Sequence, residues 1–138
     1  MRKRASYRLK RYGNLLLLRA AIGGKGNDVA VARLLVDTGS SYTILPVEVI
    51  EQMGYDLQHP VRRVLMASAN GIVAAPMITV SWFNCLGQRL KNFPVVAHTI
   101  PNATFDGLLG MDFLTRCRAV IAVAEAEIRC QRSKTQRP

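Results

Sequence analysis

The chain has 138 residues, of which 49% are hydrophobic and 20% are charged, and its formal net charge at pH 7 is +10. This length suits one globular domain with a substantial core, and there is no apolar run of about 18 residues that would predict a membrane span. Cys85, Cys117 and Cys130 lack the spacing of a zinc site or a disulfide framework. We therefore expect reduced thiols, no metal, no cofactor and a cytoplasmic location.

The positive charge is concentrated at the two ends of the chain. Residues 1–11 contain six basic residues and residues 129–138 contain four, and neither segment contains an acidic residue. The other nine basic and nine acidic residues cancel between residues 12 and 128. We expect basic tails at 1–14 and 131–138 that are solvated and mobile. Such tails could attract nucleic acid or an acidic partner, although residues 12–128 lack the basic-aromatic pattern of a nucleic-acid surface.

The first half of the chain consists of short strand-like segments separated by Gly, Pro and Asn, which predicts a mostly β fold. Residues 15–22 and 29–36 are expected to pair as a hairpin around a glycine-rich turn. Residues 43–45 follow as a brief strand. A short helix is expected over 46–53, because proline suits a first helical turn and the glycine that follows suits a helix end.

The second half predicts two more hairpins and another short helix. Residues 64–69 and 72–83 are joined by Asn70-Gly71, and Asn-Gly is the strongest two-residue hairpin signal. The remaining expected elements are a strand, a helix and a closing hairpin, at residues 88–97, 111–116, 120–123 and 128–130.

The most informative motif is Asp37-Thr38-Gly39, which directly follows the apolar strand ending at Val36 and precedes Ser40. The strand stiffens the approach to the carboxylate, and the glycine permits a close turn that a Cβ would obstruct. The hydroxyl groups can hydrogen-bond a carboxylate or the nearby backbone. An ordinary Asp-Thr-Gly surface turn is the simple alternative, so the rest of the sequence has to decide between the two interpretations.

This loop resembles the active-site loop of the retropepsin-like aspartic proteases, a short, single-domain group of retroviral and bacterial type. A second block, Leu108-Leu109-Gly110, is similar to the family's hydrophobic-hydrophobic-Gly element, which supports the loop and precedes a short helix. The resemblance covers roughly residues 15–130 and implies a mostly β, single-lobe acid-protease β-barrel with short helices. It also implies a hairpin flap, whose tip would lie at Ala69, Asn70, Gly71 and Ile72.

By this resemblance the protein would be an aspartic endopeptidase, in which two carboxylates share one proton and activate water. The chain has one Asp-Thr-Gly, and Asp112 falls on the expected short helix, where we give it a structural role. The second carboxylate is therefore expected from a C2 homodimer, with Asp37 of each protomer at the axis. In the family, the residue corresponding to Thr38 hydrogen-bonds across that axis and the one corresponding to Gly39 offers backbone groups to the substrate.

The expected substrates are peptides or proteins bound in an extended conformation beneath the flap. The apolar side chains expected to line the subsites are Val36, Ile72, Val73 and Leu109. Ser40 suggests a pH dependence, because a hydroxyl that donates to the outer oxygen of Asp37 would stabilise the ionised carboxylate. We therefore expect activity to peak on the acid side of neutrality.

The main alternative is a catalytically silent binding or adaptor module that keeps this fold and contacts nucleic acid or acidic partners through its tails. The intact Asp-Thr-Gly-Ser argues against it, because nothing else in such a fold requires a carboxylate there. A serine or cysteine hydrolase is disfavoured, since His59 and His98 accompany no nucleophile motif.

Overall fold

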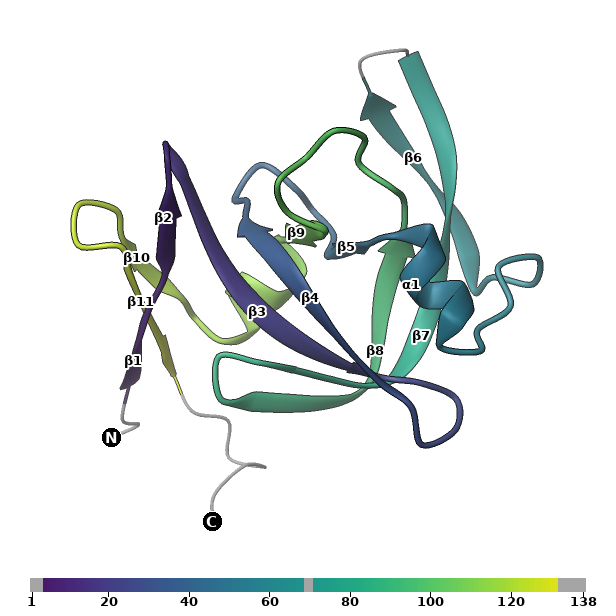
Figure 1. Cartoon of the computed structure of the whole chain (residues 1–138), viewed down its shortest axis with the longest axis horizontal. Helices are drawn as coiled ribbons and strands as arrows, with labels where there is room; N and C mark the ends of the chain where they lie inside the picture. Colours follow the sequence, from purple (N-terminus) through teal and green to yellow (C-terminus); the bar gives the residue numbers. More distant parts are fainter. Residues whose placement is uncertain (1–3, 69–70, 132–138) are drawn as a thin grey trace.

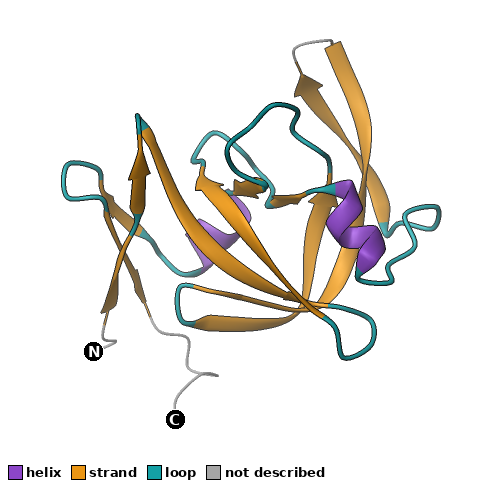
Figure 2. Cartoon of the chain, viewed as in Figure 1, coloured by secondary structure: helices purple, strands orange, loops and turns teal. Residues whose placement is uncertain are grey.

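The computed structural model describes residues 4–68 and 71–131. The described chain consists almost entirely of strands, with two helices of six residues each (Figures 1 and 2). The strands are β1 Arg4–Arg8, β2 Lys10–Tyr12, β3 Leu15–Gly23, β4 Val29–Val36, β5 Ile44–Leu45, β6 Arg62–Ser68, β7 Gly71–Cys85, β8 Gln88–Ala97, β9 Gly107–Leu109, β10 Val120–Ala122 and β11 Glu127–Gln131. The helices are α1 Val47–Gln52 and α2 Met111–Arg116.

The larger sheet has the order β2-β3-β4-β9-β5-β8-β7-β6, and an additional pairing of β3 with β7 curls it back on itself. The pairs β4–β9 and β5–β8 are parallel, and the other ladders are antiparallel. A smaller sheet, β1-β11-β10, stands at one side of the larger one (Figure 1). The architecture confirms the expected mostly β fold with short helices.

The hydrophobic core connects α2 to the larger sheet through three phenylalanine rings. Phe83 on β7 stacks on Phe93 of β8 with ring centroids 5.0 Å apart, and Phe113 of α2 meets both rings edge-on at 5.7 and 6.2 Å. All three side chains are buried. Aromatic pairs in this geometry contribute about 0.5–1.5 kcal/mol beyond their area burial. The short helix is therefore fixed by packing rather than by its own helical propensity.

The expectation of a solvated N-terminal tail is wrong for residues 4–12, which form β1 and β2. β1 pairs along its whole length with β11, and Leu9, only 3% exposed, donates its N–H to Ala126 at 2.8 Å. The physical reason is alternation, since Ala5 and Tyr7 are partly buried while Ser6 between them and the arginines on either side are exposed. The C-terminal tail expected at 131–138 lies outside the described residues apart from Gln131.

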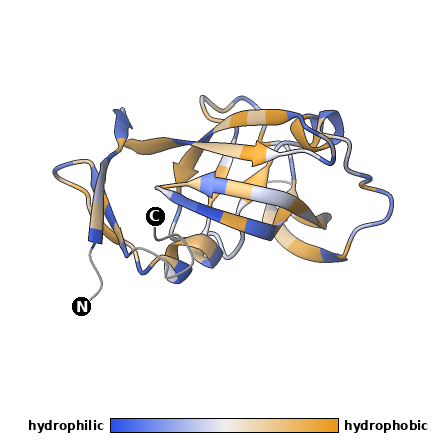
Figure 3. Cartoon of the chain, turned by 90° about the horizontal axis from the view of Figure 1, so that it is seen from below, coloured by the Kyte–Doolittle hydropathy of each residue, from blue (hydrophilic) through white to orange (hydrophobic). Residues whose placement is uncertain are grey.

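Polar and apolar residues alternate along the strands, and Figure 3 shows the strand ribbons changing repeatedly between hydrophobic and hydrophilic colours. This alternation puts one face of each strand into the core and leaves the other in water. In the part of the chain described here, neither helix has the length and apolarity needed to cross a membrane.

Candidate active site

Asp37 directly follows β4 and is held by hydrogen bonds through both its backbone and its side chain. Its N–H donates to the carbonyl of Leu109 at 3.0 Å, and its own carbonyl accepts the N–H of Ser40 at 3.2 Å. Its Oδ1 accepts the N–H of Gly39 at 2.8 Å, which closes a tight turn. The residue is half-buried. One carboxylate oxygen is thereby oriented by the backbone, while Oδ2 accepts no hydrogen bond from the described residues.

The Leu-Leu-Gly block lies beside this loop because β9 runs parallel to β4. Their register pairs Leu35 with Leu108 and Val36 with Leu109. Leu109 is fully buried and Leu108 is half-buried. The expectation that Leu109 lines a substrate subsite is therefore wrong, because its side chain is buried in the hydrophobic core.

Glycine is required at position 110 by the close passage of two backbone segments. A Cβ there would lie 2.4 Å from the carbonyl oxygen of Tyr42 and 2.9 Å from that of Ser40, distances at which atoms overlap. The next residue, Met111, donates its N–H to the Ser40 carbonyl at 2.7 Å. At Gly39 the constraint is milder, since a Cβ would lie 3.2 Å from Asp37 Oδ1. The start of α2 is thus bonded directly to the end of the Asp37 loop.

Asp112 is engaged in structural hydrogen bonds, which confirms its expected structural role. Its Oδ2 accepts the N–H of Thr43 at 2.9 Å, and its Oδ1 accepts the Thr43 hydroxyl and the Phe113 N–H, each at 2.8 Å. The Thr43 hydroxyl oxygen also accepts the N–H of Gly110 at 3.2 Å. Thr43 is fully buried. Sequence reasoning missed Thr43, because nothing local to it indicates a partner 69 residues away.

Ser40 does not make the hydrogen bond that the sequence suggested. Its hydroxyl donates to the carbonyl of Tyr42 at 2.7 Å, two residues further along the chain. A hydroxyl has one proton to donate, so this bond leaves none for the Asp37 carboxylate. The turn after Asp37 brings the Tyr42 carbonyl within reach, and the side chain stabilises the loop instead of the charge.

Thr38 is exposed and lines a cavity of about 500 Å³ between the Asp37 loop, α2 and β10. The cavity is partly apolar, with contributions from Met111, Leu114 and Val120. Met111 and Val120 are 40% and 38% exposed, which is considerable for large apolar side chains. Arg4 also lines this cavity and donates to the backbone carbonyl of Arg118 at 3.0 Å. An exposed apolar hollow therefore adjoins the loop that carries the carboxylate.

The hairpin expected as the flap is formed by β6 and the first part of β7, and its tip end extends away from the rest of the molecule (Figure 1). The rest of β7 pairs with β8. Ala69 and Asn70 lie outside the described residues. Gly71 begins β7 with a φ of +113°, a conformation that other residues rarely adopt. Ile72 is 74% exposed and Leu65 of β6 is 76% exposed. The hairpin thus presents large apolar side chains to solvent.

The chain matches a known protein family in sequence and a solved structure in fold. The family model described as "Aspartyl protease" matches residues 19–113, which is more than half of the chain. Among solved structures, the crystal structure of a retropepsin-like aspartic protease from Rickettsia conorii matches with a TM-score of 0.63 and 21% sequence identity. The match covers 95% of this chain and 93% of that chain, and at this identity it bears on the fold alone. No match was found among curated proteins.

Proposed function

The chain belongs to the aspartyl protease family and has a retropepsin-like fold, and from this premise we propose that it is an aspartic endopeptidase active as a C2 homodimer. The observation that carries the proposal is the difference between two carboxylates. Asp37 is half-buried with Oδ2 open, whereas Asp112 accepts three hydrogen bonds from Thr43 and Phe113. One copy therefore offers one reactive carboxylate for chemistry that uses two.

In the proposed dimer the two Asp37 carboxylates share one proton, because like charges at such short range do not both ionise. The ionised carboxylate takes a proton from water as the water attacks the scissile carbonyl carbon. The protonated carboxylate donates its proton to the carbonyl oxygen as charge develops there. The Gly39 N–H, bound to Oδ1, keeps the carboxylate oriented during these transfers. No covalent intermediate between enzyme and substrate is formed.

The surface next to Asp37 supports the dimeric arrangement. Thr38 is exposed and the adjoining cavity has apolar walls at Met111 and Val120, a composition typical of protein interfaces. A second protomer related by a two-fold axis near Thr38 would cover this hollow and bring its own Asp37 close.

The proposed substrate is an extended peptide bound between the active-site loop and the β6–β7 hairpin. Its backbone would add β-type hydrogen bonds, and its side chains would meet apolar residues of the site. Ile72 is exposed, and Val73 and Val36 are half-buried, so each has surface left to offer a substrate.

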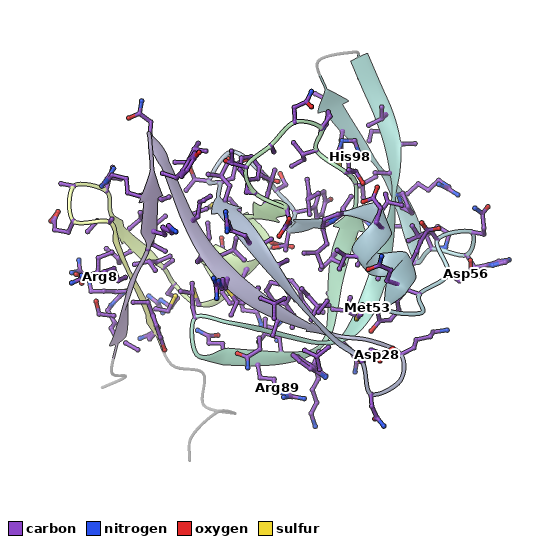
Figure 4. The ribbon with its side chains drawn as sticks, viewed as in Figure 1. Arg8, Asp28, Met53, Asp56, Arg89 and His98 are labelled. Carbon is purple, nitrogen blue, oxygen red and sulfur yellow. The ribbon has the colours of Figure 1, made fainter. Side chains whose placement is uncertain are left out.

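The test is cleavage of a diverse peptide mixture from about pH 3 to pH 8, read by mass spectrometry. Three proteins are compared: wild type, Asp37→Asn and the matched control Asp28→Asn. Asp28 lies in the β3–β4 turn, at the opposite end of β4 from Asp37 (Figure 4). The control removes the same charge without touching the site.

Cleavage by wild type and Asp28→Asn, but not by Asp37→Asn, is the expected result. Equal cleavage by Asp37→Asn would contradict the proposal. No cleavage by any of the three, in protein shown to be folded and dimeric, would favour the binding or adaptor module instead.

A further inference from the structure

Two of the three cysteines lie in direct contact in the interior, away from the active-site carboxylate. Cys117 ends α2 and Cys130 lies on β11, and their Sγ atoms are 2.7 Å apart. Each residue is 1% exposed. A disulfide bond has a sulfur–sulfur distance of about 2.05 Å, so an approach of about 0.7 Å separates this contact from a covalent bond.

The backbone holds the two thiols in place from both sides. The N–H of Gln131, which follows Cys130, donates to the carbonyl of Cys117 at 2.8 Å. The N–H of Cys117 donates to Phe113 within the helix end at 3.0 Å. Cys130 also pairs with Ala5 in the β1–β11 ladder. Bringing the sulfurs together therefore requires side-chain adjustment rather than movement of a whole element.

We propose that Cys117 and Cys130 form a reversible intramolecular disulfide when the protein meets hydrogen peroxide or another small hydroperoxide. The Cys117 thiolate attacks a peroxide oxygen, the O–O bond breaks, and Cys117 sulfenic acid and hydroxide result. The Cys130 sulfur then attacks the Cys117 sulfur, and the sulfenic oxygen leaves as water. In sum, two thiols and one hydrogen peroxide give one disulfide and two waters, with the thiols oxidised and the peroxide reduced.

The contact between the two thiols indicates which one attacks the peroxide and which one resolves the sulfenic acid. The thiols of Cys117 and Cys130 share a hydrogen bond in which either sulfur can be the donor, and this contact holds the pKa of Cys117 below its ordinary value. The positive charge of Arg4 acts in the same direction. The same hydrogen bond, together with burial, raises the pKa of Cys130. Cys117 is therefore the sulfur that ionises first and attacks, and Cys130 is the one that resolves the sulfenic acid.

Cys85 is excluded from this chemistry by its surroundings. Burial raises the pKa of its thiol, and in the part of the chain described here its sulfur makes no hydrogen-bond contact with another sulfur. It provides an internal control for thiol reactivity.

Access to the pair is expected through local opening of β1. This strand is at the edge of the small sheet, and it covers Cys130 through the β1–β11 ladder. Edge strands open more readily than central ones, and peroxide is small enough to enter a partly opened sheet. The inference does not depend on the proposed proteolysis.

The experiment treats the full-length, folded protein with hydrogen peroxide, blocks free thiols with N-ethylmaleimide in denaturant, and measures intact mass and linked peptides. In wild type we expect one blocked thiol, at Cys85, and a linkage between Cys117 and Cys130 that dithiothreitol reverses. Cys85→Ala is expected to form the same linkage, and Cys117→Ala to form none. Because the linkage is mapped in wild type, the result does not depend on the folding of either variant.

Three outcomes would each overturn the proposal. The first is three blocked thiols at a peroxide dose that fully oxidises glutathione in the same tube. The second is sulfinic acid at Cys117 or Cys130 without a linkage. The third is a disulfide that includes Cys85 or joins two chains.

Discussion

Thr43 and Asp112, 69 residues apart in the sequence, are joined by two hydrogen bonds, one from the Thr43 N–H and one from its hydroxyl. The same hydroxyl oxygen accepts the N–H of Gly110, so one buried side chain binds two positions at the start of α2. This cluster connects the segment after the Asp37 loop to the start of α2. The position of Asp37 therefore depends on polar contacts that are not themselves part of the reaction.

Thr43→Val removes this hydroxyl while keeping the side-chain volume nearly unchanged. Asp112 Oδ1 loses the hydrogen bond from this hydroxyl, and the Gly110 N–H loses its acceptor. A buried polar group that loses its hydrogen-bond partner lowers the free energy of unfolding by about 1–3 kcal/mol. We expect a loss of that size in the free energy of unfolding, measured by urea denaturation, and a lower kcat. Thr104→Val, an exposed change in the loop before β9, is the matched control and should alter neither quantity. Unchanged stability in Thr43→Val would contradict the structural importance of the cluster.

Gly110→Ala places a methyl group where the Tyr42 carbonyl oxygen lies 2.4 Å away. The loop and α2 must move apart, and overpacking of this kind costs about 1–3 kcal/mol. We expect a lower melting temperature and a loss of peptide cleavage larger than the loss of folded protein. Gly26→Ala is the comparison, because a Cβ there meets nothing within 4 Å. Equal behaviour of the two variants would show that the close passage at position 110 is not limiting.

Mixing chains tests the shared site directly. When wild type is refolded with an equal amount of Asp37→Asn, about half of the wild-type protomers enter mixed dimers under random pairing. Mixed dimers have one carboxylate and should be inactive, so activity per wild-type chain should fall to about half. Refolding with Asp28→Asn in place of Asp37→Asn should cause no such fall. Undiminished activity in the first mixture would mean that each protomer works alone.

Ser40→Ala separates loop stability from carboxylate chemistry. The Ser40 hydroxyl donates to the Tyr42 carbonyl, so its loss should weaken the loop and leave the acid limb of the kcat/KM profile within about half a pH unit of wild type. The activity maximum itself is expected below pH 7, because the paired carboxylates have to hold one proton between them. Ser41→Ala serves as the exposed comparison. A shift of the acid limb of the kcat/KM profile to higher pH by a full pH unit would indicate that the Ser40 hydroxyl donates to the Asp37 carboxylate in the active enzyme.

Local signals in the sequence were sufficient for most of the fold. The β6–β7 hairpin agrees with the Asn70-Gly71 signal, and α2 matches the expected helix at Met111–Arg116. β1 was missed because its partner, β11, lies more than a hundred residues away, and a short run of alternating polar and apolar residues does not reveal a distant pairing partner. β9 was missed as a strand because three residues are too few for a periodic pattern.

At the candidate site the motif located Asp37 and the segment that supports it, since both depend on residue types in a recognisable order. The partner of the Ser40 hydroxyl and the role of Thr43 could not be predicted in the same way. Each depends on the path of the backbone. That path brings the Tyr42 carbonyl within hydrogen-bond distance of the Ser40 hydroxyl, and the Asp112 carboxylate within hydrogen-bond distance of the Thr43 hydroxyl.

The pairing of Arg4 with Gln131 has a consequence for how the chain is made. During synthesis from the N-terminus, β1 emerges before the other strands described here, yet it has no partner until β11 has left the ribosome. The small sheet must therefore close last, after the larger sheet has had time to form around Phe83 and Phe93. A chain released before Glu127 would leave β1 with no strand to pair with. The complete fold therefore forms only when the polypeptide has been synthesised through β11.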